Sequence, residues 1–227
     1  MKIQLNVLFL SLSLFSALAH ASEAGGVTVG GTRLIYNGAK KEASLNISNT
    51  DTSPYLIQSW ADAERETTEK VPFIVTPPLF RLEGGQKNRL RIVRTAGNLP
   101  EDRESLYWLN IKSIPSSEKK ENVNTLQIAV RTRIKLIYRP AALKTSPLNE
   151  ADKLSWSQSG SRLTVNNPTP FYMNFQEVRV GGKEVKEATY VAPASQATFT
   201  APASASGPVT WKLITDYGGV SEPFSQK

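Results

Sequence analysis

Two serine–lysine pairs have a spacing that covalent catalysis could use. Ser116 and Lys119, and likewise Ser117 and Lys120, stand three residues apart, as do the nucleophile and lysine in the S-x-x-K motif of serine acyltransferases. That motif works where it opens a helix in a preorganised site. Here both pairs fall in the polar stretch SSEKKEN between two predicted strands. We therefore expect no catalysis from them.

The exported chain has no histidine or cysteine with which to carry out catalysis. The sequence contains one histidine and no cysteine, and the histidine, His20, precedes the cleavage site expected after Ala21. Residues 22–227 therefore lack a Ser-His-Asp triad, a cysteine nucleophile, a haem ligand set and a His/Cys zinc site. The carboxylates show no calcium-loop or two-metal spacing. We predict a protein that is not an enzyme and holds no metal or other cofactor.

The N-terminal segment predicts export. It begins with an early cation, Lys2, continues with an apolar stretch over residues 7–19, and ends in the small-x-small triplet at 19–21. These features are typical of a secretory signal peptide, here residues 1–21. A membrane anchor is the weaker interpretation, because the apolar run is short and interrupted by serines. No later segment is apolar enough to span a bilayer, so we expect no membrane insertion.

The charge balance is basic, with 27 Lys and Arg against 20 Asp and Glu and a net charge of +7. Such a balance could suit nucleic acid, a membrane surface or an anionic protein segment. Export argues against nucleic acid, and most of the cations are dispersed among acidic residues. We interpret most of them as a solvated surface and expect no nucleic-acid partner.

The stretch LQIAVRTRIKLIYR, residues 126–139, alternates with a period of two. Its even-numbered residues are apolar apart from a threonine, whereas its odd-numbered residues include three arginines and Lys135. This pattern predicts a β-strand with one apolar and one polar face. At ~3.4 Å per residue the strand would be about 45 Å long, more than twice the usual length.

The two ends of this predicted strand have different expected roles. We expect the apolar residues at 134–138 to lie in a core. Leu126, Ile128 and Val130 follow a polar loop and form the far end of the strand. An overhanging end would leave its backbone groups and its apolar side chains available to another chain. That arrangement is β-strand addition. We interpret Arg131 and Arg133 as solvated cations.

The rest of the chain predicts an all-β fold. Short alternating runs bounded by Gly, Pro, Asn and Ser recur, and no long window shows a helical period. The GGK turn at 181–183 indicates a hairpin. Because one sandwich takes about 100 residues, we predict two domains. The Pro-flanked stretch 139–153 is the expected joint, with domains at 22–144 and 145–227.

Several of these segments together resemble the PapD-like periplasmic pilus chaperones of the chaperone/usher pathway. The motifs are the 126–140 stretch, GTRLIY at 31–36, ESLYWLNIKSIP at 104–115 and NPTPFYMNF at 167–175, and the resemblance continues to TDYGG at 215–219. It implies two immunoglobulin-like sandwiches in a boomerang arrangement. It also implies a periplasmic chaperone that binds, folds and caps pilus subunits by donor-strand complementation and delivers them to an outer-membrane usher. The short loop at 116–125 indicates the short-loop subclass.

The resemblance also assigns the binding residues. The family's cleft arginine and lysine match Arg33 and Lys135, which would hold the C-terminal carboxylate of a subunit. Charge-assisted hydrogen bonds of this kind contribute roughly 1.5 to 3 kcal/mol each. The donor residues match Leu126, Ile128 and Val130, each contributing on the order of 1.5 to 3 kcal/mol when buried in a subunit groove. Strict alternation puts Lys135 on the opposite face from these three, which a twist or a bulge would reconcile.

Three more residues match the family's charged cluster between the domains: Glu104, Arg139 and Asp216. The resemblance implies that they fix the angle between the two sandwiches. An ordinary surface ion pair is the alternative for any two of them.

Two other functions and one further association stay open at this stage. The alternative to a chaperone is a secreted β-sandwich module that binds carbohydrate or another ligand, with Trp60, Trp156 or Trp211 as a stacking platform, although a core position is more typical of such residues. An enzyme built on Ser-Lys pairs or carboxylates ranks last. Self-association of the free protein through its exposed strand is left open.

Overall fold

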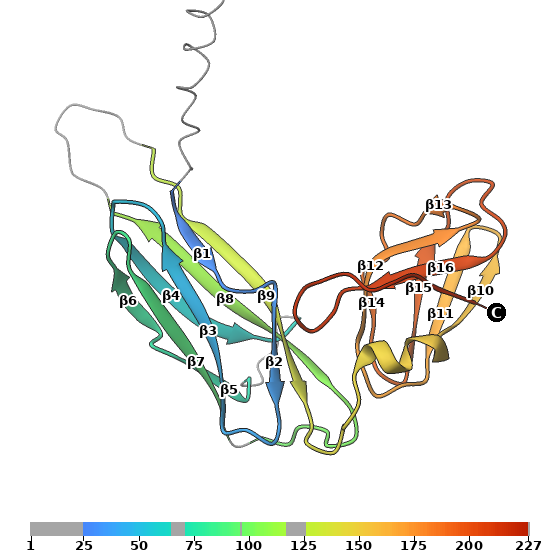
Figure 1. Cartoon of the computed structure of the whole chain (residues 1–227), viewed down its shortest axis with the longest axis horizontal. Coiled ribbons are helices and arrows are strands. Elements are labelled where there is room, and N and C mark those ends of the chain that lie inside the picture. The colour runs from blue at the N-terminus through green and yellow to red at the C-terminus, as the bar shows by residue number, and fades with distance from the viewer. Residues whose placement is uncertain (1–24, 65–70, 96, 117–125, 227) are drawn as a thin grey trace, which may run out of the picture.

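The computed structural model describes residues 25–64, 71–95, 97–116 and 126–226. These residues form two β-sandwich domains set at an angle to each other (Figure 1), which confirms the predicted all-β fold. The predicted signal peptide and most of the 116–125 loop, with its serine–lysine pairs, lie outside the described residues. In the part that is described, no helix has the length and apolar character needed to cross a membrane.

The first domain packs two sheets against each other. The first sheet has the order β1-β3-β7-β5 and the second the order β2-β9-β8-β4-β6. The bounds are β1 Val27–Val29, β2 Arg33–Asn37, β3 Glu42–Asn49, β4 Tyr55–Asp62, β5 Phe73–Thr76, β6 Leu79–Leu82, β7 Lys87–Arg94, β8 Ser105–Pro115 and β9 Val130–Arg139.

The N-terminal segment of this domain changes sheets. β1 pairs antiparallel with β3, whereas β2, a few residues later, pairs parallel with β9 in the other sheet. The two strands are separated by Gly30 and Gly31, and a side chain at Gly30 would meet the carbonyl oxygen of Asn46 at 3.1 Å. The switch brings Arg33 beside β9.

The second domain is also a sandwich, with sheets ordered β10-β11-β15 and β13-β12-β16-β17, while β14 pairs with β12. The bounds are β10 Ser155–Ser159, β11 Arg162–Asn167, β12 Met173–Val180, β13 Lys183–Glu184, β14 Tyr190–Val191, β15 Ser195–Thr200, β16 Val209–Leu213 and β17 Phe224–Ser225. The predicted GGK hairpin is confirmed: β12 and β13 pair Val180 with Lys183, and both intervening glycines have positive φ, as a tight two-residue turn requires.

Each domain has its own apolar core. The core of the first domain ends in sequence at Tyr138, and the core of the second begins at Ala151. Between them runs a linker that includes a short 3-10 helix, η2, Pro147–Lys153. Leu143 already packs against the second core. We keep a boundary near Thr145 as a proposal, since it lies between the two cores.

Strand β9 is shorter than the sequence pattern predicts. It begins at Val130, whereas residues 126–129 are described but belong to no strand. The neighbour β8 ends at Pro115, and the last pair of the ladder is Ser113 with Val130. Continuing that register would place Pro115, which has no N–H to donate, beside residue 128. The prediction of a strand starting at Leu126 is therefore wrong.

Candidate functional site

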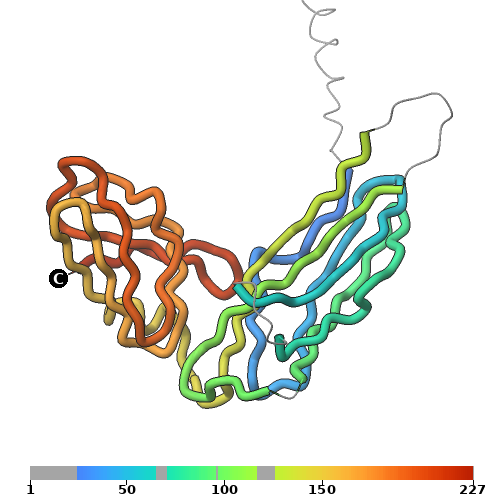
Figure 2. The backbone as a smooth tube through the Cα atoms, turned by 180° about the vertical axis from the view of Figure 1, so that it is seen from behind, coloured from blue at the N-terminus to red at the C-terminus, as the bar shows by residue number. Residues whose placement is uncertain are grey.

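One edge of β9 is open along its first half. β8 pairs with β9 from Val130 to Tyr138, but β2 pairs with it only from Lys135 to Arg139. Among the described residues, no strand covers the outer edge from Val130 to Ile134. The N–H and C=O groups that point outward there can accept another strand. In Figure 2, which shows the molecule from behind, the yellow-green β9 runs along the border of the first domain that faces the second domain.

The apolar side chains of this end are exposed. Leu126 is 87%, Ile128 64% and Val130 55% exposed. Large apolar side chains with such exposure are few among the described residues, and these three fall within five positions. The side-chain amide of the intervening Gln127 donates to the carbonyl oxygen of Pro115. A contiguous exposed apolar stripe beside an open strand edge is typical of a protein-binding surface.

The open edge ends at two cations. Arg33 and Lys135 are register partners in the parallel β2–β9 ladder, and paired residues of neighbouring strands project from the same face. The Nε atom of Arg33 is buried and makes no hydrogen bond. Lys135 donates from Nζ to the Oδ1 atom of Asn174 in the second domain. The two cations therefore lie together at the junction of the domains.

Electrostatics at this junction favour an anionic ligand. Burial, and secondarily the charge of Arg33, lower the pKa of Lys135 to about 8, while Glu64 acts in the opposite direction. Burial also lowers the pKa of Arg33, which the charge of Asp216 partly offsets. Two neighbouring cations that lose solvation on folding are stabilised by a carboxylate placed between them.

The β8–β9 register shows whether Val130 and Lys135 lie on the same face of β9. It is continuous from the Ser113–Val130 pair to the Ser105–Tyr138 pair. There is no bulge between Val130 and Lys135, so the two side chains keep opposite faces of β9. Ile134 and Tyr138 point into the core with the same parity as Val130. A chain paired on the open edge lies in the plane of the sheet. Its side chains can meet the Val130 face while its end turns to the Lys135 face.

The three residues of the predicted charged cluster lie together between the domains. Arg139 donates from Nε to Glu104 at 2.6 Å and from Nη1 and Nη2 to Asp216 at 2.6 and 2.8 Å. Glu104 is only 3% exposed and also accepts a hydrogen bond at 2.8 Å from the backbone N–H of Tyr172. This bidentate, buried arrangement differs from an ordinary surface ion pair.

The cluster ties the first domain to the second. Glu104 and Arg139 flank the β8–β9 ladder, whereas Asp216 follows β16 in the loop that reaches the first domain beside β9 (Figures 1 and 2). Burial raises the pKa of Glu104, which the charge of Arg139 opposes. Burial alone lowers the pKa of Arg139, but the hydrogen bonds and charges of Asp216 and Glu104 outweigh it and raise that pKa overall. The guanidinium therefore stays charged.

Arg131 and Arg133 are held on the outer face of the sheet. Both donate to the carboxylate of Asp62, at 3.0 and 3.1 Å. Their guanidinium groups also lie over the rings of Trp60 and Trp108, at 5.0 and 4.4 Å from the ring centroids. They remain partly exposed, so the interpretation as solvated cations holds only in part.

The tryptophans proposed as a stacking platform for sugars are mostly unavailable. Trp156 and Trp211 are 5% and 1% exposed and belong to the second core. Trp60 is half-buried beneath Arg131. Core positions, the expected ones for such residues, are what the second domain shows.

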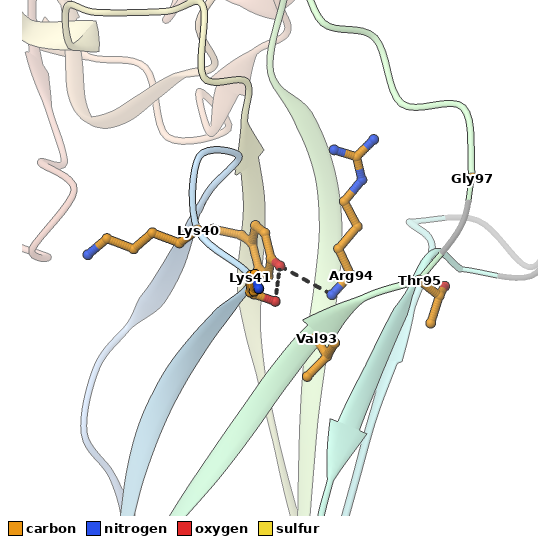
Figure 3. A pocket seen from close by; sticks show the side chains of 7 residues that line it. Lys40, Lys41, Val93, Arg94, Thr95 and Gly97 are labelled. Atoms are coloured by element: carbon orange, nitrogen blue, oxygen red, sulfur yellow. Dashed lines mark hydrogen bonds between the residues drawn. The ribbon is translucent and has the colours of Figure 1, made fainter.

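A separate pocket of about 510 Å³ lies at the other end of the first domain (Figure 3). The hydroxyl of Tyr36 donates to the carbonyl oxygen of Lys41 at 2.8 Å and accepts from the backbone N–H of Arg94 at 3.2 Å. Arg94 also contacts Tyr138 and Glu101 through its guanidinium. Tyr36 pairs with the far end of β9, roughly 27 Å from Val130. The pocket is thus distinct from the open edge.

Family models decide which proteins the chain is related to. The model for pili and flagellar-assembly chaperones, PapD N-terminal domain, matches residues 26–144, and the model for the pili assembly chaperone PapD, C-terminal domain, matches residues 149–225. The chain belongs to the PapD-like pilus assembly chaperones. In the part of this chaperone that the structure describes, no cluster of three or more His, Cys, Asp or Glu side chains could hold a metal ion.

Individual relatives agree with the family models. The probable fimbrial chaperone LpfB of Escherichia coli O157:H7 is 44% identical over 222 residues, which cover 96% of this chaperone and 95% of the relative. A chain from the structure of the Salmonella enterica SafA pilin in complex with the SafB chaperone matches with a TM-score of 0.83 and 42% identity, over 90% and 97% of the two chains. The E. coli chaperone DraB matches with a TM-score of 0.80 and 45% identity, over 89% and 98%.

Sequence reasoning missed the second-domain side of this chaperone's junction. Asn174 and Tyr190 contact Lys135, and Glu64, which follows β4, accepts a hydrogen bond from the Tyr190 hydroxyl. Asn174 is a buried polar residue within the apolar run FYMNF, which is a signal that could have been noticed. For Tyr190 and Glu64 the sequence offers no comparable signal.

Proposed function

We propose that this chaperone binds a pilus subunit along the open edge of β9 and holds the subunit's terminal carboxylate between Arg33 and Lys135. One observation carries the proposal: the exposed apolar stripe at residues 126–130 leads into the open edge of β9, and that edge ends at Lys135 and its β2 neighbour Arg33. The subunit would receive from β9 a strand that its own sandwich lacks. The chaperone thereby caps the subunit until assembly.

The end of the edge supplies the register of the complex. A guest chain can pair with β9 from Val130 to Ile134, but β2 occupies the edge from Lys135 onward. The guest must therefore stop or leave the sheet where Arg33 and Lys135 stand. A terminal carboxylate pinned there leaves only one register for the guest strand, because a shift by one residue would turn every side chain to the other face.

The affinity comes from three sources. Backbone hydrogen bonds along the edge supply a sequence-independent part. The two cations contribute charge-assisted hydrogen bonds, each worth roughly 1.5 to 3 kcal/mol. Leu126, Ile128 and Val130 contribute on the order of 1.5 to 3 kcal/mol each where the subunit groove buries them. No covalent bond is made or broken, so the proposed function needs no catalytic residue.

The cellular setting follows from the family and the leader. The N-terminal segment 1–21 has the features of a secretory signal, which supports a periplasmic location. By analogy with the family, the loaded chaperone delivers its subunit to an outer-membrane usher. The charged cluster of Glu104, Arg139 and Asp216 would fix the angle between the domains, and with it the place of the two cations relative to the open edge.

A peptide titration tests the carboxylate anchor. A synthetic peptide copying the C-terminal strand of a candidate subunit is titrated in two forms, one with a free carboxylate and one amidated. We expect the parent protein to bind the free form about 10- to 100-fold more tightly. Arg33→Ala and Lys135→Ala should each lower the affinity for the free form by at least about tenfold and narrow the difference between the two forms.

Arg162→Ala is the matched control, because Arg162 is an exposed cation of β11 in the other domain. It should bind both peptides as the parent does. If the parent binds the two peptide forms equally, and if Arg33→Ala and Lys135→Ala bind as the parent does, the two cations do not anchor the guest. A panel of C-terminal peptides from different subunits guards against choosing a non-cognate one.

A further inference from the structure

The ammonium of Lys135 is held by two side chains of the second domain. Its Nζ atom donates a hydrogen bond to Oδ1 of Asn174 and lies 4.1 Å from the ring centroid of Tyr190. Lys135 itself belongs to β9 of the first domain. One cation of the anchor is therefore positioned from across the domain junction.

The two contacting residues form one small platform. Asn174 of β12 and Tyr190 of β14 are register partners in an antiparallel ladder, so their side chains stand side by side. Asn174 is 5% exposed, and the ring of Tyr172 lies 5.9 Å from the ring of Tyr190. Such packing leaves the amide and the ring little freedom to move away from Lys135.

The charged groups that face Lys135 come from different elements. Arg33 lies beside it on β2, and its charge opposes the ammonium, whereas Glu64 after β4 supports it. The hydroxyl of Tyr190 on β14 donates to Glu64. A cation over an aromatic face and a donor to an amide oxygen are both favourable to the charged ammonium. The platform thus counters the burial of Lys135 and the repulsion from Arg33.

The ammonium still has capacity for a guest. A lysine Nζ carries three N–H donors, and the structure gives one of them to Asn174. We propose that Asn174 and Tyr190 are positioning residues, which keep the Lys135 ammonium charged and directed at the terminal carboxylate of the subunit. This inference rests on the proposed function. It adds that the second domain takes part in carboxylate recognition, so that the anchor is complete only when both domains are in place.

Three variants separate the parts of the platform. Asn174→Ala removes the amide acceptor, and Tyr190→Leu removes both the ring and the hydroxyl. Tyr190→Phe keeps the ring and removes only the hydroxyl that contacts Glu64, so it is the matched control. Each is titrated with the free-carboxylate and the amidated peptide over a range of pH, after urea unfolding has shown that it is folded.

We expect Asn174→Ala and Tyr190→Leu to bind the free-carboxylate peptide about 3- to 30-fold more weakly than the parent, with little change for the amidated peptide. The pH above which binding weakens should also move to lower values, because the ammonium loses its proton sooner. Tyr190→Phe should keep the parent's profile. The pKa of Lys135, measured by NMR of its Nζ in the free protein, should fall in the first two variants and not in the third.

The outcomes distinguish this inference from the proposed function. If the parent prefers the free carboxylate, but Asn174→Ala and Tyr190→Leu show the same preference and the same Lys135 pKa, the positioning role is wrong and the carboxylate anchor stands. If the parent itself shows no preference, both proposals fail. A merely structural role would weaken both peptides equally and leave the pH profile in place, which would also overturn the inference.

Discussion

The two halves of β9 differ although their sequence pattern is the same. From Lys135 to Tyr138 the strand has β2 on one side and β8 on the other, and its apolar residues are buried. From Val130 to Ile134 it has only β8, and Val130 is 55% exposed while Ser113, directly opposite on β8, is 8% exposed. At this pair β8 is therefore covered, whereas β9 is not. What the open half lacks is a lateral neighbour.

This difference shows how one strand can serve both folding and binding. The paired half contributes to the core and to the charged cluster, which stabilises the protein without a guest. The open half presents the same kind of strand with one partner missing, which a guest chain could supply. Substitutions of buried residues in the paired half should therefore act on stability, and substitutions of exposed apolar residues at the open end should act on binding.

The largest expected effect is at the end of the paired half. Arg139→Ala leaves the buried carboxylate of Glu104 without its main partner, and breaking a buried pair in this way costs about 3–5 kcal/mol. Urea unfolding monitored by circular dichroism measures the loss. Arg133→Ala removes an arginine of the open half whose pair with Asp62 is partly exposed, and should cost at most about 1 kcal/mol. Equal losses for the two variants would contradict the distinction.

The next effect compares two aliphatic residues of the same apolar series. Leu136 is fully buried in the first core, so Leu136→Ala should lower the free energy of unfolding by about 2–5 kcal/mol. Ile128→Ala truncates a side chain that is 64% exposed and should change the free energy of unfolding by no more than about 0.5 kcal/mol. Unfolding midpoints with unchanged m-values check both. A loss at Ile128 as large as that at Leu136 would mean that the open end packs on the protein itself.

The third effect concerns binding, for which the open end should matter more than the paired half. Ile128→Ser should weaken binding of a whole pilus subunit, whose groove would bury this side chain, by about 10- to 100-fold, since a buried Ile contributes on the order of 1.5 to 3 kcal/mol. Isothermal titration calorimetry measures it. Ile74→Ser is the control, because Ile74 is similarly exposed, at 53%, but lies on β5 of the other sheet. If both serine variants bind like the parent, the exposed stripe is not the donor surface.

The sequence predicted the fold better than the exact ends of its elements. Alternation indicated the β-sandwich fold, the chain length indicated two domains, and the GGK turn indicated the hairpin at 181–183. It wrongly extended β9 back to Leu126. The start of a strand also depends on where its neighbour stops, and β8 stops at Pro115, which lies outside the alternating stretch. The period of two in the sequence does not indicate where β8 ends, and so does not predict where β9 begins.

The candidate site shows the same limit. The positions of Arg33, Lys135 and the charged cluster came from the resemblance to a family, and the structure brings these residues together at the junction. Asn174, Tyr190 and Glu64 were not predicted, because their contacts with Lys135 and with one another join segments of two domains. Such contacts depend on the angle between the domains, which no local pattern encodes.

The smallest effect is a pH dependence at the boundary between the two halves. The pKa of Lys135 is lowered to about 8 in the free protein by burial and by Arg33, and a bound carboxylate would raise it again. Affinity for the free-carboxylate peptide should therefore be constant below about pH 7. Above pH 8 it should fall by at most about tenfold per unit. Titrations at successive pH values measure this, and the amidated peptide should show no such fall.

The stability of the free protein should change in the opposite sense over the same range. Because the pKa of Lys135 is about 8 when folded and 10.5 in its ordinary environment, the unfolded chain binds more protons between these values, and the contribution of this residue to stability rises with pH there. Lys135→Arg should remove both trends, since a guanidinium keeps its proton throughout. A parent whose peptide affinity stays flat from pH 6 to 10 would show that Lys135 does not hold the carboxylate. The boundary between the two halves would then mark only the end of a strand pairing.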